Sequence, residues 1–416
     1  VSAADKTTIT FWHAMGGTNG EVLQQIVDDF NASQDEIEIK AEYQGTYDDT
    51  ITKLKAAMQS DSGLPDVCQM YDVGTKFMYD SGAVIPVEDK FESTGYDKSS
   101  VMEVISSYYT VDGKQYAMPF NVSTPMLYYN KDVFEAAGLD PETPPTTYDE
   151  VLEDAKKIVE SGAAPVGYSQ AIYGWFFEQQ LAGLGVTYGN NDNGRKEAVT
   201  AVDFDSNGGG LKVFDMWKKL YDSGYFEDYG TTTADTQTAF FSGQVGMIIE
   251  STAILKNAVD SSPFEVGTGY LPRIEQNDEG GVIIGGGSLW LTDTGNEANE
   301  DAAWKFIEYI TTPDVQAKWS MGTGYFAINE KAYETDDMKA YLKENPNFET
   351  AINQLKDSPV NCNTAGVLSG VQTEARLTFN EIMPQVYDGK LTTQDAVDQL
   401  AASVNKAIEN YNESIK

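Results

Sequence analysis

The chain of 416 residues contains one histidine, His13, and only two cysteines, Cys68 and Cys362. Histidine is a frequent metal ligand and the usual acid or base near neutral pH, so its scarcity argues against a catalytic centre. A zinc site built almost without His and Cys is equally unexpected. We therefore predict no metal, no cofactor, no catalytic residues and no enzymatic activity. We read both cysteines as free, although their separation in sequence does not exclude a disulfide.

Basic residues are also scarce, with 28 Lys and Arg against 65 Asp and Glu and a formal net charge of −37. Nucleic-acid binding depends on Lys and Arg that neutralise phosphates, so we expect no nucleic-acid partner. No apolar run approaches the roughly 18–20 residues that a membrane-spanning helix needs. Like charge on this scale disfavours self-association, and a monomer is therefore expected.

Hydrophobic residues, by contrast, make up 41% of the chain, enough to build large cores. At 416 residues the chain exceeds one typical domain, so we expect two lobes. Strand-like and helix-like patterns alternate near the start. They predict strands at 8–12, 37–43 and 65–70 and helices at 21–30 and 47–59. This order predicts an α/β sheet covered by helices, with its ligand-binding edge at the carboxyl ends of the strands.

Aromatic residues follow all three of these predicted strands. Trp12 and His13 end the first strand, the segment 43–47 follows the second, and Tyr71 and Asp72 follow the third. A single aromatic residue in a loop more often packs at a rim than binds a ligand. Three successive strand ends with aromatic residues give a stronger indication of a binding site.

The stretch 118–132, MPFNVSTPMLYYNKD, separates two sets of βα units. Pro119 and Pro125 restrict the backbone and remove donors, so we expect no continuous regular structure there, with a strand-like run only at 126–129. We interpret it as a crossing between the lobes, in which the backbone bends while Ser123 contacts the ligand. A surface loop within one domain is the alternative.

Three later motifs complete the predicted architecture. In AFFSGQVGMIIES, a short helix and a buried strand lead to Glu250 and Ser251. Segments 264–272 and 323–329 are predicted as two further crossings. VIIGGGSLWL is predicted as a strand pair with a glycine-rich turn. No Lys and no helix follow Gly285–Gly287, so we predict close backbone approach to a ligand or strand rather than a phosphate-binding loop.

Six segments together resemble a known family, and they occur in order along the chain: ITFWHAM, MYDVGT, PFNVSTPMLYYNKD, GLDPETPPTTYDE, IIGGGSLW and TGYFAIN. They resemble the extracellular solute-binding proteins of carbohydrate-type ABC importers, and most of all the sn-glycerol-3-phosphate-binding members. The resemblance implies a type II periplasmic-binding-protein fold, in which two α/β lobes joined by crossing segments enclose a ligand cleft. By motif position, it implies one lobe of residues 1–122 with 272–322 and another of residues 123–271 with 323–416.

The resemblance also implies a ligand-binding set. Contact positions of the glycerophosphate-binding members match Tyr47, Ser123, Trp175, Ser251, Gly286, Tyr325 and Arg376. Asp72 stands where those members have glutamate, and Ile172 where they have a tryptophan, which leaves the identity of the ligand open. Together with the residues found from the chain itself, the predicted site comprises Trp12, His13, Tyr47, Tyr71, Asp72, Ser123, Thr124, Tyr173, Trp175, Glu250, Ser251, Gly286, Gly287, Tyr325 and Arg376.

Two ligand classes fit this set. A sugar or oligosaccharide is bound by planar polar groups that share hydrogen bonds with hydroxyls, while aromatic faces cover its C–H surface. Glycerol-3-phosphate or a glycerophosphodiester would need Arg or Lys, and Arg376 is the one cation placed in the site. The two changed positions and the acidic chain favour the sugar, whereas the retained contact set favours the phosphate.

The resulting functional prediction is an extracellular protein that closes on its ligand by a hinge and delivers it to ABC importer permease subunits. The resemblance implies that it is periplasmic or anchored as a lipoprotein. A secreted glycan-active enzyme is the competing class, with Asp72 and Glu250 as its two carboxylates. A pure interaction protein is the third.

Overall fold

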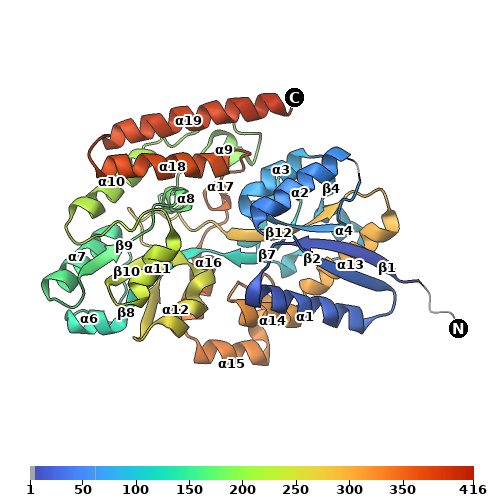
Figure 1. Ribbon diagram of the computed structural model, residues 1–416, viewed down its shortest axis with the longest axis horizontal. Coiled ribbons are helices and arrows are strands. Elements are labelled where there is room, and N and C mark those ends of the chain that lie inside the picture. The colour runs from blue at the N-terminus through green and yellow to red at the C-terminus, as the bar shows by residue number, and fades with distance from the viewer. Residues whose placement is uncertain (1–4, 61) are drawn as a thin grey trace. The chain divides into compact units, whose positions relative to one another are not determined.

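The computed structural model describes residues 5–60 and 62–416, and its chain divides into two compact units. The first unit runs to Ser123 and resumes over Ile284–Glu344. The second unit comprises Thr124–Ile283 and Asn345–Lys416. Each unit has its own β-sheet with packed helices (Figure 1).

The first unit is built on a mixed sheet with the order β2-β1-β3-β12-β4, to which β7 is added by pairing with β12. The strands are β1 (Thr7–His13), β2 (Ile37–Tyr43), β3 (Val67–Tyr71), β4 (Val84–Ile85), β7 (Met118–Ser123) and β12 (Gly285–Thr292). β1 pairs in parallel with β2 and β3, whereas β12 is antiparallel to β3. The alternating strands and helices predicted for the start of the chain are confirmed. A small hairpin, β5 (Thr110–Val111) with β6 (Lys114–Gln115), stands apart from this sheet.

Helices cover both faces of this sheet, with α1 on one side and α2 and α3 on the other (Figure 1). Ile26, Val27 and Phe30 recur at helical spacing and are buried, which explains why α1 packs on the sheet. The helices are α1 (Gly17–Ser33), α2 (Tyr47–Ser60), α3 (Thr75–Asp80), α4 (Val87–Thr94), α5 (Glu103–Ser106), α13 (Glu297–Ile310), α14 (Pro313–Thr323) and α15 (Asp336–Glu344).

The second unit is built on a sheet of order β11-β8-β10-β9. Its strands are β8 (Pro125–Asn130), β9 (Val166–Ser169), β10 (Val245–Ser251) and β11 (Val266–Gly269). Its helices are α6 (Lys131–Ala136), α7 (Tyr148–Glu160), α8 (Gly174–Gly183), α9 (Asn190–Gly194), α10 (Gly209–Asp222), α11 (Thr233–Phe241), α12 (Leu255–Ser261), α16 (Asn347–Asp357), α17 (Cys362–Ala365), α18 (Gln372–Tyr387) and α19 (Thr393–Ser414). The last two helices run side by side (Figure 1), and the ring of buried Phe379 in α18 packs against the rings of Phe177 and Trp217.

The proline-containing stretch is more regular than predicted, because residues 118–123 form a strand as well as the expected run at 126–129. It forms β7 in the first unit and β8 in the second, with only Thr124 between them. Pro119 lies in β7, which is joined to the sheet through β12, and Pro125 is the first residue of β8. Both are positions at which a sheet tolerates a missing N–H donor.

The glycine-rich segment also differs from its prediction. Residues 285–292 form one continuous strand, β12, and not a strand pair with a turn. Its pairing with β7 shifts register between Gly286 and Ser288, which marks a β-bulge. Gly286 has φ +98°, a conformation that glycine adopts without strain.

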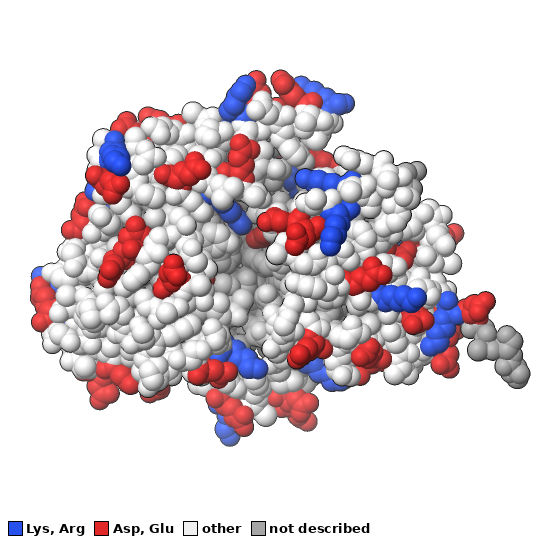
Figure 2. Space-filling view, in the orientation of Figure 1, with Lys and Arg blue, Asp and Glu red and all other residues white. Residues whose placement is uncertain are grey.

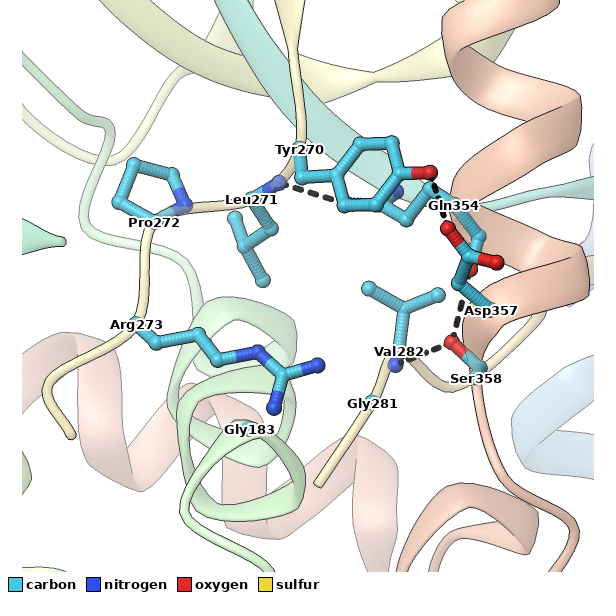
Figure 3. Close-up of a pocket in the computed structure, with 10 residues that line it drawn as sticks. All are labelled: Gly183, Tyr270, Leu271, Pro272, Arg273, Gly281, Val282, Gln354, Asp357 and Ser358. Atoms are coloured by element: carbon cyan, nitrogen blue, oxygen red, sulfur yellow. Dashed lines mark hydrogen bonds between the residues drawn. The ribbon is translucent and has the colours of Figure 1, made fainter. Parts of the chain in front are cut away.

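The segment 264–272 is part of the second unit. Its strand β11 pairs with β8, and the backbone N–H of Leu271 donates to Gln354 Oε1 at 2.6 Å (Figure 3). Further along, Val282 N–H donates to Ser358 Oγ at 3.1 Å. These residues border a cavity of about 30 Å³, which has room for about one or two water molecules.

The segment 323–329 is likewise held within one unit, the first. Phe326 N–H donates to the Val122 carbonyl at 3.0 Å, and Ile328 N–H donates to Gln316 Oε1 at 2.8 Å. The units therefore divide at 283/284 and 344/345, whereas the sequence placed these divisions at 271/272 and 322/323. The first division, at 123/124, lies one residue from its predicted place.

The surface carries the excess of acid expected from the composition. Figure 2 shows Asp and Glu scattered over the visible face with fewer Lys and Arg among them. Both cysteines are free, as predicted. Over the part of the chain that the structure describes, no helix has both the length and the hydropathy to cross a membrane.

Candidate functional site

Two predicted tyrosines meet in the first unit. Tyr47 begins α2, Tyr71 ends β3, and their rings stack with centroids 5.2 Å apart and an interplanar angle of 15°. The Tyr71 hydroxyl donates to Asp48 at 3.1 Å, which holds the ring over its neighbour. Both rings are half-buried, so each keeps some surface for contact with a ligand.

Asp72 follows Tyr71 and opens a short 3-10 helix, Asp72–Gly74. Its carboxylate accepts a hydrogen bond from Val73 N–H at 2.8 Å, and its carbonyl accepts one from the Tyr108 hydroxyl at 3.1 Å. Burial raises the pKa of Tyr47 far above its ordinary value, and the charges of Tyr325 and Asp72 add to the rise. Tyr47, Tyr71, Asp72 and Tyr325 are thus brought together.

Asn121 lies at the centre of this group, although the sequence did not point to it. It is fully buried in β7, donates from Nδ2 to the Tyr47 hydroxyl at 2.7 Å, and accepts at Oδ1 from Gln69 Nε2 at 2.8 Å. Burial raises the pKa of Tyr325, and the neighbouring Asn121 amide opposes this rise. The only signal in the sequence is a carboxamide set between Phe120 and Val122, where a buried polar group needs partners.

The glycines of β12 make room for Asn121. A Cβ atom on Gly286 would lie 1.8 Å from the Asn121 carbonyl oxygen, and one on Gly287 would lie 2.5 Å from Asn121 Oδ1. Gly285 pairs with Ser123, the last residue of β7, whose side chain is buried. The glycines therefore allow close approach of two strands.

Trp12 and His13 lie at the end of β1. Trp12 Nε1 donates to Glu42 of β2 at 3.1 Å, which turns this ring toward β2. His13 is buried, its Nδ1 accepts from Met15 N–H at 3.2 Å, and burial lowers its pKa to about 4. His13 is therefore neutral at physiological pH. Of the described contacts, none joins Trp12 to the Tyr47 group.

In the second unit, Thr124, Glu250 and Ser251 form one group at the start of β8 and the end of β10. Thr124 exchanges hydrogen bonds with Thr252, donating from its N–H to Oγ1 at 3.1 Å and accepting at its carbonyl from Thr252 N–H at 2.7 Å. The Ser251 hydroxyl accepts from Ala253 N–H at 3.1 Å, which leaves its own hydrogen for another acceptor.

Glu250 is 4% exposed. Its carboxylate accepts from Ser251 N–H at 2.9 Å and from Gln237 Nε2 at 3.1 Å. Burial raises its pKa to about 7, against the opposing effect of these two donors. Glu250 is therefore partly protonated near neutral pH and can both donate to and accept from a hydroxyl.

Tyr173, Trp175 and Arg376 form a second group in this unit. Tyr173 precedes α8, and its ring lies 5.9 Å from that of Trp175, which is buried in the core. A Cβ atom on Gly174 would lie 2.6 Å from Arg376 Cα, so α18 approaches α8 very closely here. Among the contacts described within this unit, none links this group to Glu250.

Arg376 forms a bidentate ion pair with Glu178 of α8. Its Nε and Nη2 atoms donate to the two carboxylate oxygens at 2.7 and 3.0 Å, and the side chains are only 14% and 8% exposed. The positive charge of Arg376 is therefore already balanced within the second unit. The described residues include no group of three or more His, Cys, Asp or Glu arranged to hold a metal ion.

Known proteins match this chain over nearly its whole length. Residues 25–350 match the family model of bacterial extracellular solute-binding proteins. The sn-glycerol-3-phosphate-binding periplasmic protein UgpB of Escherichia coli K12 is 31% identical over 417 residues, which cover 99% of this chain and 94% of that protein.

Solved structures of other binding proteins also match nearly the whole of this chain. The cyclic α-maltosyl-1,6-maltose binding protein of Arthrobacter globiformis has a TM-score of 0.81 at 26% identity, covering 98% of this chain and 100% of that one. UgpB of Mycobacterium tuberculosis in complex with glycerophosphocholine has a TM-score of 0.81 at 20% identity, with the same coverage. The predicted fold class is confirmed, and the chain belongs to the family of bacterial extracellular solute-binding proteins.

Proposed function

We propose that this protein captures a neutral polyhydroxylated ligand, a sugar or oligosaccharide, and delivers it to the permease subunits of an ABC importer. Membership of the solute-binding family supports the transport role. The single observation that carries the choice of a neutral ligand is the bidentate Arg376–Glu178 ion pair.

The argument from charge takes the two units separately. In the first unit, the predicted contacts are aromatic side chains, the imidazole of His13, the hydroxyl of Ser123, the carboxylate of Asp72 and two glycines, with no Lys or Arg among them. In the second unit, Glu178 balances Arg376, and Glu250 adds a further acid. A phosphate needs cationic donors that are not already matched by a carboxylate. Hydroxyl groups, by contrast, both donate and accept, and they suit carboxylates, phenols and serines together.

Ligand capture is proposed to follow a hinge mechanism, with each unit supplying part of the site. The chain passes from one unit to the other at three points, 123/124, 283/284 and 344/345. So few connections support a hinge between the units. A ligand that contacts both units selects the closed arrangement. The partners are the permease subunits, and the protein acts as a monomer.

Glycerol-3-phosphate or a glycerophosphodiester is the second candidate ligand. The observation in its favour is the 31% identity to UgpB of Escherichia coli along the whole chain. The 26% identity to the cyclic α-maltosyl-1,6-maltose binding protein favours a saccharide instead. The ion pair that balances the charge of Arg376 supports the saccharide.

Calorimetric titration with maltotriose, cyclic maltosyl-maltose, sn-glycerol-3-phosphate and glycerophosphocholine tests the proposal. We expect binding of at least one saccharide and none of either phosphate compound. Glu178→Gln, which releases the charge of Arg376, should raise affinity for the phosphate compounds, whereas the exposed Glu135→Gln should not. Tight binding of a phosphate compound by the unaltered protein, with no saccharide bound, would establish the second candidate.

Catalysis is not part of the proposed function. The relatives named above are binding proteins, and we propose the same for this chain. Incubation with the saccharide panel should leave every compound intact. Cleavage that depends on Asp72 would show instead that the protein is a glycan-active enzyme.

A further inference from the structure

We propose that Asn121 is a positioning residue. It ends a relay of buried amides that starts at the backbone of Ala14 and orients Tyr47 and Tyr325 as hydrogen-bond donors to the ligand. This inference rests on the proposed ligand-binding role of the two tyrosines. It concerns the first unit alone.

The relay begins at an unambiguous donor. Ala14 N–H donates to Gln69 Oε1 at 2.9 Å, and a backbone N–H has no other role than donor. The oxygen of the Gln69 carboxamide must therefore face Ala14, and its NH₂ group must face away. That NH₂ group meets Asn121 Oδ1 at 2.8 Å. The direction of the Gln69 amide thus follows from its chemistry.

The same reasoning sets the direction of the next amide. Because Asn121 Oδ1 accepts from Gln69, its NH₂ group must face the tyrosines, and Nδ2 lies 2.7 Å from the Tyr47 hydroxyl oxygen. A hydrogen bond from Asn121 also opposes the effect of burial, which raises the pKa of Tyr325. Tyr325 lies beside β7 because the next residue, Phe326, pairs with Val122, so the NH₂ group of Asn121 faces two phenols.

The direction of the Asn121 amide determines what the hydroxyl hydrogens of Tyr47 and Tyr325 can do. The Tyr47 oxygen accepts from Asn121 at 2.7 Å, and the same amide opposes the rise that burial causes in the pKa of the neighbouring Tyr325 hydroxyl, so both O–H hydrogens can be donated to a ligand. Tyr47 and Tyr325 are half-buried, whereas Asn121 and Gln69 are 0% exposed. The tyrosines can therefore contact a ligand while the amides act only through them. The first unit presents two donors to ligand oxygens, such as those of sugar hydroxyls.

The glycines of β12 enclose the relay. The position of a Cβ atom on Gly287 lies 2.5 Å from Asn121 Oδ1, so any side chain there would displace the amide. A buried polar chain in which every link is satisfied is rigid. The direction of both phenols is therefore built into the ligand-free protein.

Asn121→Asp is the decisive variant because it keeps the shape of the side chain but removes both N–H donors. The phenols must then donate to the carboxylate, which gives them partial phenolate character. Full-length ligand-free protein labelled with ¹³C at tyrosine Cζ reports this directly. We expect the Cζ resonances of Tyr47 and Tyr325, assigned through the Phe variants, to move downfield.

Asn130→Asp is the matched control, since Asn130 is also buried but caps α6 in the second unit. It should leave both resonances in place. Gln69→Glu is a second variant in case Asn121→Asp does not fold. The carboxylate introduced by Gln69→Glu would accept from Ala14 and could not donate, so Asn121 would turn over and produce the same downfield shift. Unchanged Cζ resonances in the folded variants would overturn the relay.

Binding supplies an independent readout. With maltotriose as the probe, Asn121→Asp should weaken affinity by up to about tenfold, since a lost hydrogen bond commonly costs up to a factor of about ten. In a Tyr47→Phe/Tyr325→Phe background, the same change should have little effect. An equal loss in both backgrounds would contradict the inference. If maltotriose does not bind the unaltered protein, that result counts against the proposed ligand class. The Cζ resonances still test the relay independently.

Discussion

At the scale of single residues, two buried ionisable groups respond to pH in opposite senses. Burial lowers the pKa of His13 in the first unit from 6.5 to about 4. The contribution of His13 to the free energy of unfolding is therefore fully present above pH 6.5 and is lost as the pH falls toward 4. Glu250 in the second unit has its pKa raised from 4.5 to about 7, again by burial. Its contribution is present below pH 4.5 and is lost as the pH rises through 7.

Glu250→Gln is predicted to change the pH dependence of stability between pH 4.5 and 8. Glutamine does not ionise, so the free energy of unfolding of the variant relative to the unaltered protein should increase with pH across this window. Urea denaturation at pH 5, 6, 7 and 8 measures it. Glu135→Gln, at an exposed position, should give a difference that does not vary with pH. The same flat result for Glu250→Gln would show that its carboxyl group is ionised throughout.

Gly286→Ala is predicted to be much more destabilising than Gly82→Ala. Both glycines have positive φ, which costs a non-glycine residue roughly 1–3 kcal/mol. Only at Gly286 would the new Cβ atom also collide with a backbone oxygen, that of Asn121, whereas nothing lies within 4 Å at Gly82. The two midpoints of urea unfolding give the comparison. Equal losses would mean that β7 and β12 separate easily.

At the scale of elements, helices α8 and α18 are joined by both shape and charge. The absence of a side chain at Gly174 lets the backbone of α18 approach at Arg376. One helical turn further along α8, the Glu178 carboxylate forms an ion pair with the Arg376 guanidinium. The small Gly174 thus lets the helices approach closely, and the ion pair fixes how far one helix is shifted along the other.

Replacing either partner of this ion pair is predicted to cost about 3–5 kcal/mol of unfolding free energy, because an uncompensated charge stays buried. Arg376→Gln and Glu178→Gln are the single variants. The double variant should lose much less than their sum, since it leaves no unmatched charge. Urea denaturation of all four proteins measures the coupling. Strict additivity would place the two side chains in water rather than in contact.

Elements set by local sequence were predictable. Thr147 followed three residues later by Glu150 predicts a helix start, and α7 does start there, with Glu150 N–H donating to Thr147 Oγ1 at 3.2 Å. In a capping box, the Glu150 carboxylate would accept from Thr147 N–H. Here it accepts from Thr146 N–H instead. Caps depend on residues three or four positions apart, which a sequence displays directly.

Elements set by distant partners were not predictable in the same way. The prolines of β7 and β8 suggested irregular backbone, but partner strands far away in the chain hold both segments extended. Asn121 was missed for the same reason, since its importance depends on Gln69, Tyr47 and Tyr325, which only the fold brings to it. Tyr325 was predicted from the family resemblance, and Tyr47 was predicted both from that resemblance and from the aromatic residues that follow the second strand.

At the scale of the whole molecule, we predict that ligand binding makes the protein more compact. If residues of both units contact one ligand, binding must favour a closed arrangement over an open one. Small-angle scattering with and without a saturating saccharide measures the radius of gyration, which should fall. The control is the same protein with a sugar that calorimetry shows not to bind. Binding without compaction would contradict hinge closure.

The position of β12 has a consequence for the order in which this protein can be made. β12 (residues 285–292) lies between β3 and β4 in the first unit's sheet and also carries β7. A ribosome reaches it only after synthesising residues 124–283 of the second unit. The second unit in turn awaits α18 and α19. The sheet of the first unit therefore cannot be completed until most of the second unit has been synthesised.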